Sequence, residues 1–358
     1  MMSGNECYLS IVATSRNDDH GGNMLRRMQI FISGWLEQCR RHALPAELIL
    51  VEWNPPEDRP RLRDALQWPD DPGPCAVRII EVPHAVHRRI PHAENLPLFQ
   101  MIAKNVGIRR AQGEFVLATN IDLLFSDELM DFFARRKLES GKYYRINRYD
   151  VRPDIPRDAP LDEQFTYCRQ NIIRVCQRDG CFDPNAGEYA QYVYRKQFYE
   201  VYNSGETRIR IPLFTNACGD FTLMARQHWF DIRGYAERAI FSFHLDSLLL
   251  YSAFHSGLEE VELRDPLRVY HIEHEAGYTP EKRLQMDQDL EMKKIPRISN
   301  EQLNWMAVQM RLENRPIIFN HADWGYQGAE FPETRIPAPI PDAQRITANA
   351  ALTAAITG

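Results

Sequence analysis

The chain has 358 residues, of which 44% are hydrophobic, 26% charged and 11% aromatic. This composition is typical of a globular protein rather than a disordered one, and a chain of this length can bury a large core. The formal net charge is −6, so the sequence lacks the basic character expected of a general nucleic-acid binder.

The sequence shows no sign of a membrane segment or of export. No stretch approaches the roughly 18 consecutive apolar residues of a membrane span. The N-terminus carries Glu6 and no cationic segment before its short apolar run, unlike a signal peptide. We therefore expect a cytoplasmic protein without a transmembrane segment.

The seven cysteines are an odd number at irregular spacing: Cys7, Cys39, Cys75, Cys168, Cys176, Cys181 and Cys218. In a cytoplasmic protein we expect them to be reduced. The last four could be gathered around zinc, but they contain no Cys-x-x-Cys pair, which argues against such a site.

The first 120 residues predict an alternation of strands and helices. Apolar runs predict strands at 9–14, 47–53, 77–82 and 114–119, and helical spacing predicts helices at 24–41 and 98–111. This order favours an α/β fold with a mainly parallel sheet flanked by helices. Ligands bind such sheets at the carboxyl ends of the strands. Polar residues stand there at 14–19, 52–54 and 120–122, and we expect them to converge on one crevice.

The rest of the chain has a different character. Residues 143–215 are rich in aromatics and broken by prolines, and we interpret them as an inserted, partly helical region over the crevice. Its tyrosines could stack on a sugar or simply pack as an amphipathic face. Helices are predicted around 281–294 and 301–313. Residues 332–342 are Pro-rich, and the Ala/Thr-rich end 343–358 is interpreted as a tail or linker, which fits a piece of a longer multidomain protein or a frayed terminus.

The sequence has no GxGxxG after its first strand, no GxxxxGK[ST], no HExxH and no GxSxG.

An acidic residue and two histidines are candidates for a metal site. Asn120 and Asp122 directly follow the fourth strand, where a carboxylate can hold a divalent cation that also binds a diphosphate. His271 and His274 follow another apolar run, and imidazoles suit Mn²⁺ better than Mg²⁺. One of the histidines could instead be a hydrogen-bonded structural residue.

Asp246 precedes the apolar helical stretch 248–254. A carboxylate at a helix N-terminus stays ionised and can accept a proton from an attacking hydroxyl. The alternative is a helix N-cap without chemistry. The residue type alone favours neither.

Taken together, these features resemble glycosyltransferases of the GT-A fold, especially the family-two type and the related β-1,4-galactosyltransferase type. Four stretches carry the likeness, which spans about residues 8 to 275: 11–17, 103–122, 217–237 and 244–246. They resemble the first nucleotide-binding strand and loop, the helix and strand before the DxD motif, the acceptor-side segment and the base motif. The resemblance implies one GT-A domain over 1–342, with a nucleotide-sugar-binding half at 8–142, the insertion at 143–215 and an acceptor and catalytic half at 216–330.

The resemblance also assigns roles to individual residues. It implies a nucleotide-diphosphate sugar donor, a glycan acceptor, inversion at the anomeric carbon and a role in polysaccharide biosynthesis. The donor-binding residues would be Thr14, Arg16, Asn17, Glu52, Asn105, Asn120 and Asp122. Asp122, His271 and His274 would hold Mn²⁺ or Mg²⁺, with Mn²⁺ favoured by the histidines. Asp246 would be the base, and Cys218, Gly219 and Phe221 would lie beside the acceptor.

Three departures from the family pattern leave alternatives open. Asn120 replaces the first Asp of DxD, His244 and Leu245 stand where a Glu is expected before the base, and Asp220 replaces a small residue of the acceptor turn. Asp220 is therefore a rival for the role of base. The loss of a carboxylate at 120 supports a second hypothesis, a GT-A-like module that binds a nucleotide or glycan without turnover. A nucleotidyltransferase would need a Gly-rich loop after the first strand, for which residues 20–22 are a poor substitute.

Overall fold

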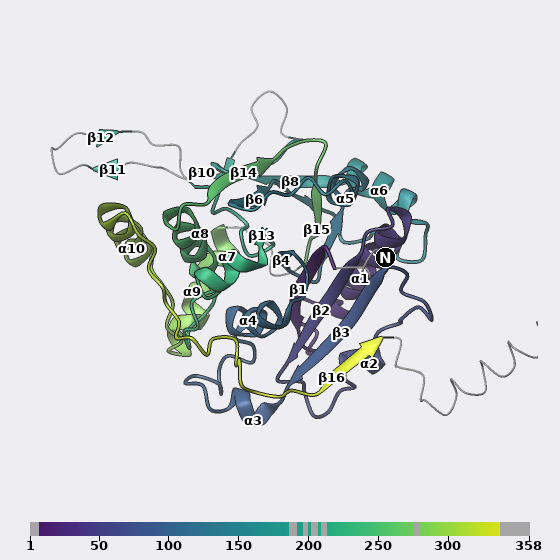
Figure 1. Ribbon diagram of the computed structural model, residues 1–358, viewed down its shortest axis with the longest axis horizontal. Coiled ribbons are helices and arrows are strands. Elements are labelled where there is room, and N and C mark those ends of the chain that lie inside the picture. The colour runs from purple at the N-terminus through teal and green to yellow at the C-terminus, as the bar shows by residue number, and fades with distance from the viewer. Residues whose placement is uncertain are drawn as a thin grey trace, which may run out of the picture.

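The computed structural model describes residues 7–185, 192–195, 200–201, 207–208, 213–274 and 280–336. Its centre is an eight-stranded sheet (Figure 1). The strands, in their order across this sheet, are β14 (Glu259–Leu263), β6 (Lys142–Ile146), β13 (Phe221–Ala225), β4 (Phe115–Thr119), β1 (Leu9–Ser15), β2 (Ala46–Trp53), β3 (Cys75–Val82) and β16 (Glu333–Ile336). Only β13 and β16 run against the others in this sheet.

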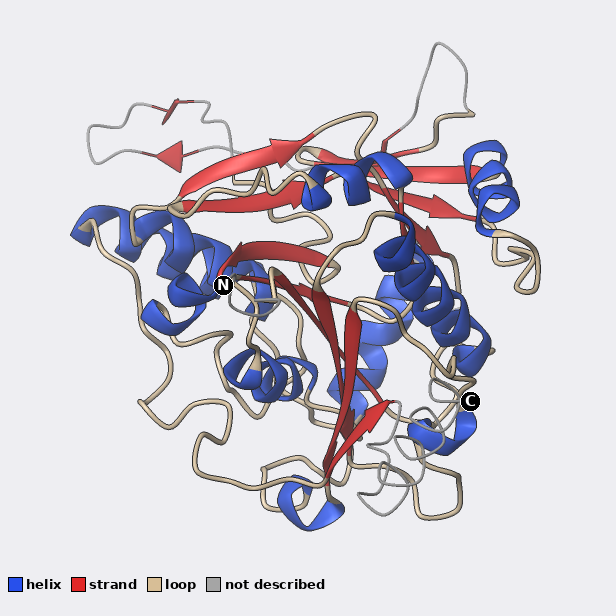
Figure 2. Ribbon diagram, turned by 45° about the vertical axis from the view of Figure 1, so that its right-hand side comes forward, coloured by secondary structure: helices blue, strands red, loops and turns tan. Residues whose placement is uncertain are grey.

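Helices cover both faces of the central sheet because the side chains of each strand alternate between two cores. Figure 2 shows helices on either side of it. On one face Ile11 and Leu48 pack with α1 (Met24–Arg41) and α5 (Asp127–Ala134). On the other, Val12 and Ile49 pack with the remaining large helices: α4 (Gln100–Arg110), α7 (Arg226–Asp231), α8 (Leu245–His255), α9 (Pro280–Met292) and α10 (Asn300–Glu313). The predicted α/β fold with a mainly parallel, helix-flanked sheet is confirmed, and it is consistent with a GT-A fold.

A second, mostly antiparallel sheet lies across one end of the first (Figure 2). Its strands, in order, are β10 (Tyr192–Arg195), β9 (Gly180–Phe182), β8 (Ile172–Gln177), β7 (Arg148–Val151), β15 (Val269–Ile272) and β5 (Leu123–Phe125). The helix α6 (Leu161–Gln170) packs against it through Leu161 and Phe165. Three short elements complete the picture: the helices α2 (Leu62–Ala65) and α3 (His84–His87) and the hairpin β11 (Glu200–Val201) with β12 (Thr207–Arg208).

The prediction of a partly helical region at 143–215 is confirmed in part. The described residues of this segment contain the helix α6, but most of them form strands, which the sequence pattern did not predict. Tyr143 and Tyr144 of β6 are buried in the central cores, which supports the packing alternative for these two. Tyr189, Tyr199 and Tyr202 lie outside the described residues, as does the predicted tail 343–358. The strand β16 lies within the Pro-rich stretch 332–342, inside the predicted domain of 1–342.

Cys176 and Cys181 form a disulfide between β8 and β9, where they are direct cross-strand partners. The expectation that all seven cysteines are reduced is therefore wrong. The zinc hypothesis loses two of its four ligands to this bond, and Cys168 and Cys218 are buried in different cores. The free thiols among the described residues are Cys7, Cys39, Cys75, Cys168 and Cys218. None of the helices in the described ranges combines the length and apolar character needed to cross a bilayer.

Candidate functional site

A cavity of about 710 Å³ opens at the carboxyl ends of β1 and β4. These two strands are parallel neighbours, so the loops that follow them start at the same edge of the sheet. The β1 side contributes Thr14, Ser15, Arg16 and Asp18, and the β4 side contributes Asn120, Ile121 and Asp122. The helix α9 adds a wall with Gln285, Met286, Asp289 and Leu290. The expected crevice is therefore present at two of the three predicted strand ends, whereas residues 52–54 do not line it.

Asp122, His271 and His274 meet at one side of this cavity. The Nε2 atom of His274 lies 3.3 Å from Oδ2 of Asp122, and Nε2 of His271 lies 3.8 Å from the same oxygen. One potential ligand atom from each residue lies within 4.8 Å of the others. Asp122 and His274 line the cavity, whereas His271, on β15, is buried behind them.

The donor set fits a divalent cation. Oδ1 of Asp122 and Nδ1 of His274 are buried without a hydrogen-bond partner, which is costly for polar atoms unless a ligand satisfies them. Burial would raise the pKa of Asp122, but the hydrogen bond with His274 and the charges of His271 and Arg27 lower it well below its usual range. An ionised carboxylate with two imidazoles suits Mn²⁺ or a similar ion.

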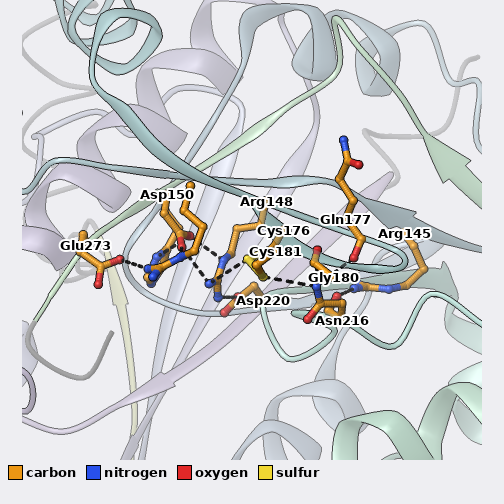
Figure 3. The surroundings of a disulfide bond; sticks show 12 residues. Arg145, Arg148, Asp150, Cys176, Gln177, Gly180, Cys181, Asn216, Asp220 and Glu273 are labelled. Atoms are coloured by element: carbon orange, nitrogen blue, oxygen red, sulfur yellow. Dashed lines mark hydrogen bonds and ion pairs between the residues drawn. A yellow bond between two sulfur atoms is a disulfide. The ribbon is translucent and has the colours of Figure 1, made fainter. Parts of the chain in front are cut away.

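A row of charged side chains, including Asp150, Arg148 and Asp220, leads to the turn before β13 (Figure 3). It meets the cluster where Asp150 contacts His271. Arg148 contacts Asp150 (Nε–Oδ1 2.7 Å) and Asp220 (Nη1–Oδ2 2.6 Å). Arg174 contacts Asp150 (Nε–Oδ2 2.5 Å) and Glu273 (Nη2–Oε2 2.6 Å). Arg148 also lies beside the disulfide, with Nη2 3.6 Å from Sγ of Cys176. The row therefore links the second sheet to the turn before β13.

The sequence-based prediction missed Lys104, which is fully buried beneath the site. Its ammonium group donates to Oδ1 of Asn120 (2.9 Å) and to the carbonyl of Gly219 (2.7 Å). Burial lowers the pKa of Lys104 to about 8, although the carboxylates of Asp220, Asp246 and Asp122 oppose this shift. Within α4, Lys104 has apolar residues one helical turn before it and one turn after it, and this pattern is the sequence signal that could have revealed its burial.

The two candidate bases have different surroundings. Both carboxylate oxygens of Asp220 are engaged, Oδ1 by the amide of Asn120 and Oδ2 by Arg148. Asp246 is half-buried in the first turn of α8, where Oδ1 accepts the N–H of Ser247 (2.8 Å). The alternative of Asp246 as N-cap is wrong, because His244 occupies that position. Asp246 does not line the cavity, and its Oδ2 lies 3.1 Å from the point where a Cβ on Gly219 would stand.

The predicted donor-binding residues divide into two groups. Thr14, Arg16, Asn120 and Asp122 line the cavity, whereas Asn17, Glu52 and Asn105 do not. Asn17 donates to the carbonyl of Pro60 (3.0 Å), and Glu52 accepts the N–H of Leu62 (2.9 Å). The side chain of Asn105, on α4, donates a hydrogen bond to the carbonyl of Tyr235 and accepts one from its N–H. The expectation that these three lie in the crevice is corrected, because each is used to hold a loop.

The acceptor-side residues also lie at different depths. Gly219 lies in the turn before β13, where its carbonyl accepts the bond from Lys104 and the carboxylate of Asp246 lies close by. Phe221 is buried in the core formed with α1, and Cys218 in the core formed with α4 and α8. Neither Cys218 nor Phe221 lines the cavity, so their expected contact with an acceptor is corrected: both side chains pack inward.

Comparisons with known proteins add little to this geometry. No protein-family model and no curated protein matches the sequence. Among solved structures, the chain is similar to the crystal structure of S. aureus TarS 1-349, with 12% sequence identity and a TM-score of 0.40. The match covers 86% of this chain and 71% of that chain. A likeness of this strength bears on neither substrate nor mechanism.

Proposed function

We propose that the protein is a glycosyltransferase that takes a sugar from a nucleotide-diphosphate donor and attaches it to a hydroxyl group of a glycan. The observation that carries the proposal is the cluster of Asp122, His271 and His274 at the wall of a cavity on the carboxyl ends of β1 and β4. A cavity of about 710 Å³ is large enough for a ligand of nucleotide-sugar size. The resemblance of four sequence stretches to GT-A glycosyltransferases supports the same assignment.

The donor would lie across the cavity, with its diphosphate at Asp122. Thr14 and Arg16 lie at the β1 wall, on the side assigned to the nucleoside. Asp122, His271 and His274 would hold Mn²⁺ or Mg²⁺, and a bound cation of this kind supplies positive charge to the leaving diphosphate. The buried partnerless atoms of Asp122 and His274 support this role.

Asp246 would accept the proton of the acceptor hydroxyl, which then attacks the anomeric carbon from the face opposite the diphosphate and inverts its configuration. Asp246 lies in the first turn of α8, beside the positive end of the helix dipole, and its Oδ2 approaches the turn at Gly219. The competing assignment to Asp220 is less well supported, since Asn120 and Arg148 already engage both of its oxygens. Asp220 is assigned to holding the turn beside the acceptor.

One observation supports a second candidate, a module that binds a nucleotide or glycan without turnover. Asn120 stands where a second carboxylate would be expected, so the cation cluster contains a single carboxylate, Asp122. Weaker cation binding would then limit or abolish catalysis. The same fold and cavity would serve either function.

A donor panel separates the two candidates. The protein is incubated with Mn²⁺ and a set of nucleotide sugars, and nucleoside diphosphate release is measured with and without glycan acceptors. Release above background supports the transferase, and Asp246→Asn should abolish it while donor affinity changes less than about twofold. Nucleotide binding without release from any donor would favour the module.

A further inference from the structure

His271 differs from His274 in the partner of its second ring nitrogen. Nδ1 of His271 lies 3.1 Å from Oδ1 of Asp150, whereas Nδ1 of His274 has no partner. Asp150 is fully buried on β7, and it is the direct cross-strand partner of His271 in the parallel pair β7 and β15. The backbone register therefore fixes this contact.

We propose that Asp150 is a positioning residue for the cation site: it accepts the Nδ1–H of His271 and so directs the lone pair of Nε2 toward the cation. This inference rests on the proposed function, because it presupposes that Asp122, His271 and His274 hold a metal ion. A carboxylate that accepts the second N–H of a ligating imidazole fixes both the tautomer and the ring orientation. Here the atom left free is Nε2, the one 3.8 Å from Asp122.

The surroundings of Asp150 make it unsuited to bind the cation itself. Its two oxygens are held by Arg148 and Arg174, with Nε–O distances of 2.7 Å and 2.5 Å. Two guanidinium groups in contact with one carboxylate repel a cation and leave little room for it. Asp150, His271 and Glu273 also offer ligand atoms within 4.8 Å of one another. The two guanidinium groups make this group a support for the first cluster rather than a second metal site.

The same surroundings should allow Asp150 to be substituted without unfolding the protein. Without the carboxylate of Asp150, Arg148 keeps its ion pair with Asp220 (2.6 Å). Arg174 likewise keeps its ion pair with Glu273 (2.6 Å). Neither of these two arginines is left without a carboxylate partner, so the Asp150→Ala variant should fold. Glu273→Ala is the matched control, since it removes one ion pair of Arg174 and leaves the bond between His271 and Asp150 in place.

A double-mutant cycle tests the proposal through Mn²⁺ affinity, measured from the electron paramagnetic resonance signal of free Mn²⁺, with circular dichroism as the check on folding. Asp150→Ala should weaken binding by about 10- to 100-fold. In the His271→Ala background, the same substitution should change the affinity by less than about twofold, because Asp150 acts only through that imidazole. Glu273→Ala should stay within about threefold of the unmodified protein.

Each other outcome is decisive. Unchanged Mn²⁺ binding by Asp150→Ala, an equal loss in the His271→Ala background, or an equal loss in Glu273→Ala overturns the positioning role and leaves the proposed function standing. Absence of Mn²⁺ binding by the unmodified protein overturns both the positioning role and the Mn²⁺ site on which it rests, and the donor panel then tests the transferase assignment separately. Should Asp150→Ala not fold, Asp150→Asn replaces it in the cycle, with a smaller coupling of the same sign expected and strictly additive losses contradicting the proposal.

Discussion

The amide of Asn120 donates a hydrogen bond to the carboxylate of Asp220. At both positions the sequence departs from the GT-A pattern, and the structure joins them in one contact. A carboxylate at 120 would face that of Asp220 without a proton between them, so the two departures compensate each other. Lys104 completes the arrangement by donating to the other side of the Asn120 amide.

Asn120→Asp should therefore destabilise the protein at pH 8, by about 1–3 kcal/mol, because it replaces a hydrogen bond with a contact between like charges. Urea unfolding measures the change. In the Asp220→Asn background the substitution should cost at least about 1 kcal/mol less, because an amide at 220 can donate to the new carboxylate. Equal costs in the two backgrounds would contradict the pairing.

Glu52 should make stability fall as the pH rises above 5. Burial raises its pKa to about 7, although the hydrogen bond from the N–H of Leu62 lowers it. Between its ordinary pKa near 4.5 and about 7, the folded protein holds a proton that the unfolded chain has lost. The free energy of unfolding therefore decreases through this window and stays low above it.

The glutamine variant isolates this effect. Glu52→Gln keeps an oxygen that accepts the N–H of Leu62 but cannot ionise. Relative to the native protein, it should gain stability between pH 5 and pH 8, on the order of 2–4 kcal/mol, as followed by chemical unfolding at each pH. A difference that does not vary with pH would show that Glu52 keeps an ordinary pKa in the folded state.

Asn105→Ala should reduce stability without affecting the donor site. The side chain bonds the carbonyl (2.8 Å) and the N–H (2.9 Å) of Tyr235. The carbonyl keeps a second bond from Asn320 (2.6 Å), but the buried N–H loses its partner, at a cost of about 1–3 kcal/mol. Calorimetric binding of nucleoside diphosphates should be unchanged. Arg16→Ala, at the cavity wall, should show the reverse: weaker binding and little change in the melting temperature. A loss of affinity in Asn105→Ala would return that residue to the donor site.

His274→Ala should raise the Mn²⁺ concentration needed for half-maximal activity by about tenfold or more, because it removes one of the imidazoles beside Asp122. A Mn²⁺ titration of sugar transfer provides the measurement. His321→Ala, at an exposed position, is the control and should leave the titration unchanged. Transfer by the unmodified protein after chelation of all divalent ions would rule out the assigned role.

The sequence predicted the first 120 residues of the fold well, because their strands are buried on both faces and so appear as continuous apolar runs. The predicted strand at 47–53 is observed as Ala46–Trp53, and the helix predicted at 24–41 is observed as Met24–Arg41. The strands of the segment 143–215 were not predicted, because they carry charged residues in buried places. Arg145 is fully buried, bonded to the carbonyls of Phe214 and Asn216, which are about 70 residues away in sequence.

The candidate site was predictable only in part, for a similar reason. Polar residues at strand ends either face the crevice or hold a loop, and the choice depends on partners distant in sequence. Asn120 and Asp122 face the cavity, whereas Glu52 turns to Leu62. The role of Lys104 depends on Gly219, 115 residues later, a relationship that no local pattern contains.

The strand β16 covers the outer edge of β3 in the central sheet. It pairs with β3 over Val77–Ile80, and its Glu333 binds Arg78 through both carboxylate oxygens, each at 2.9 Å. An uncovered β3 would present a row of free N–H and C=O groups, which invites edge-to-edge aggregation. Shortened versions of the chain that end before residue 333 should therefore self-associate, so a soluble fragment for crystallisation or screening has to retain this last pairing.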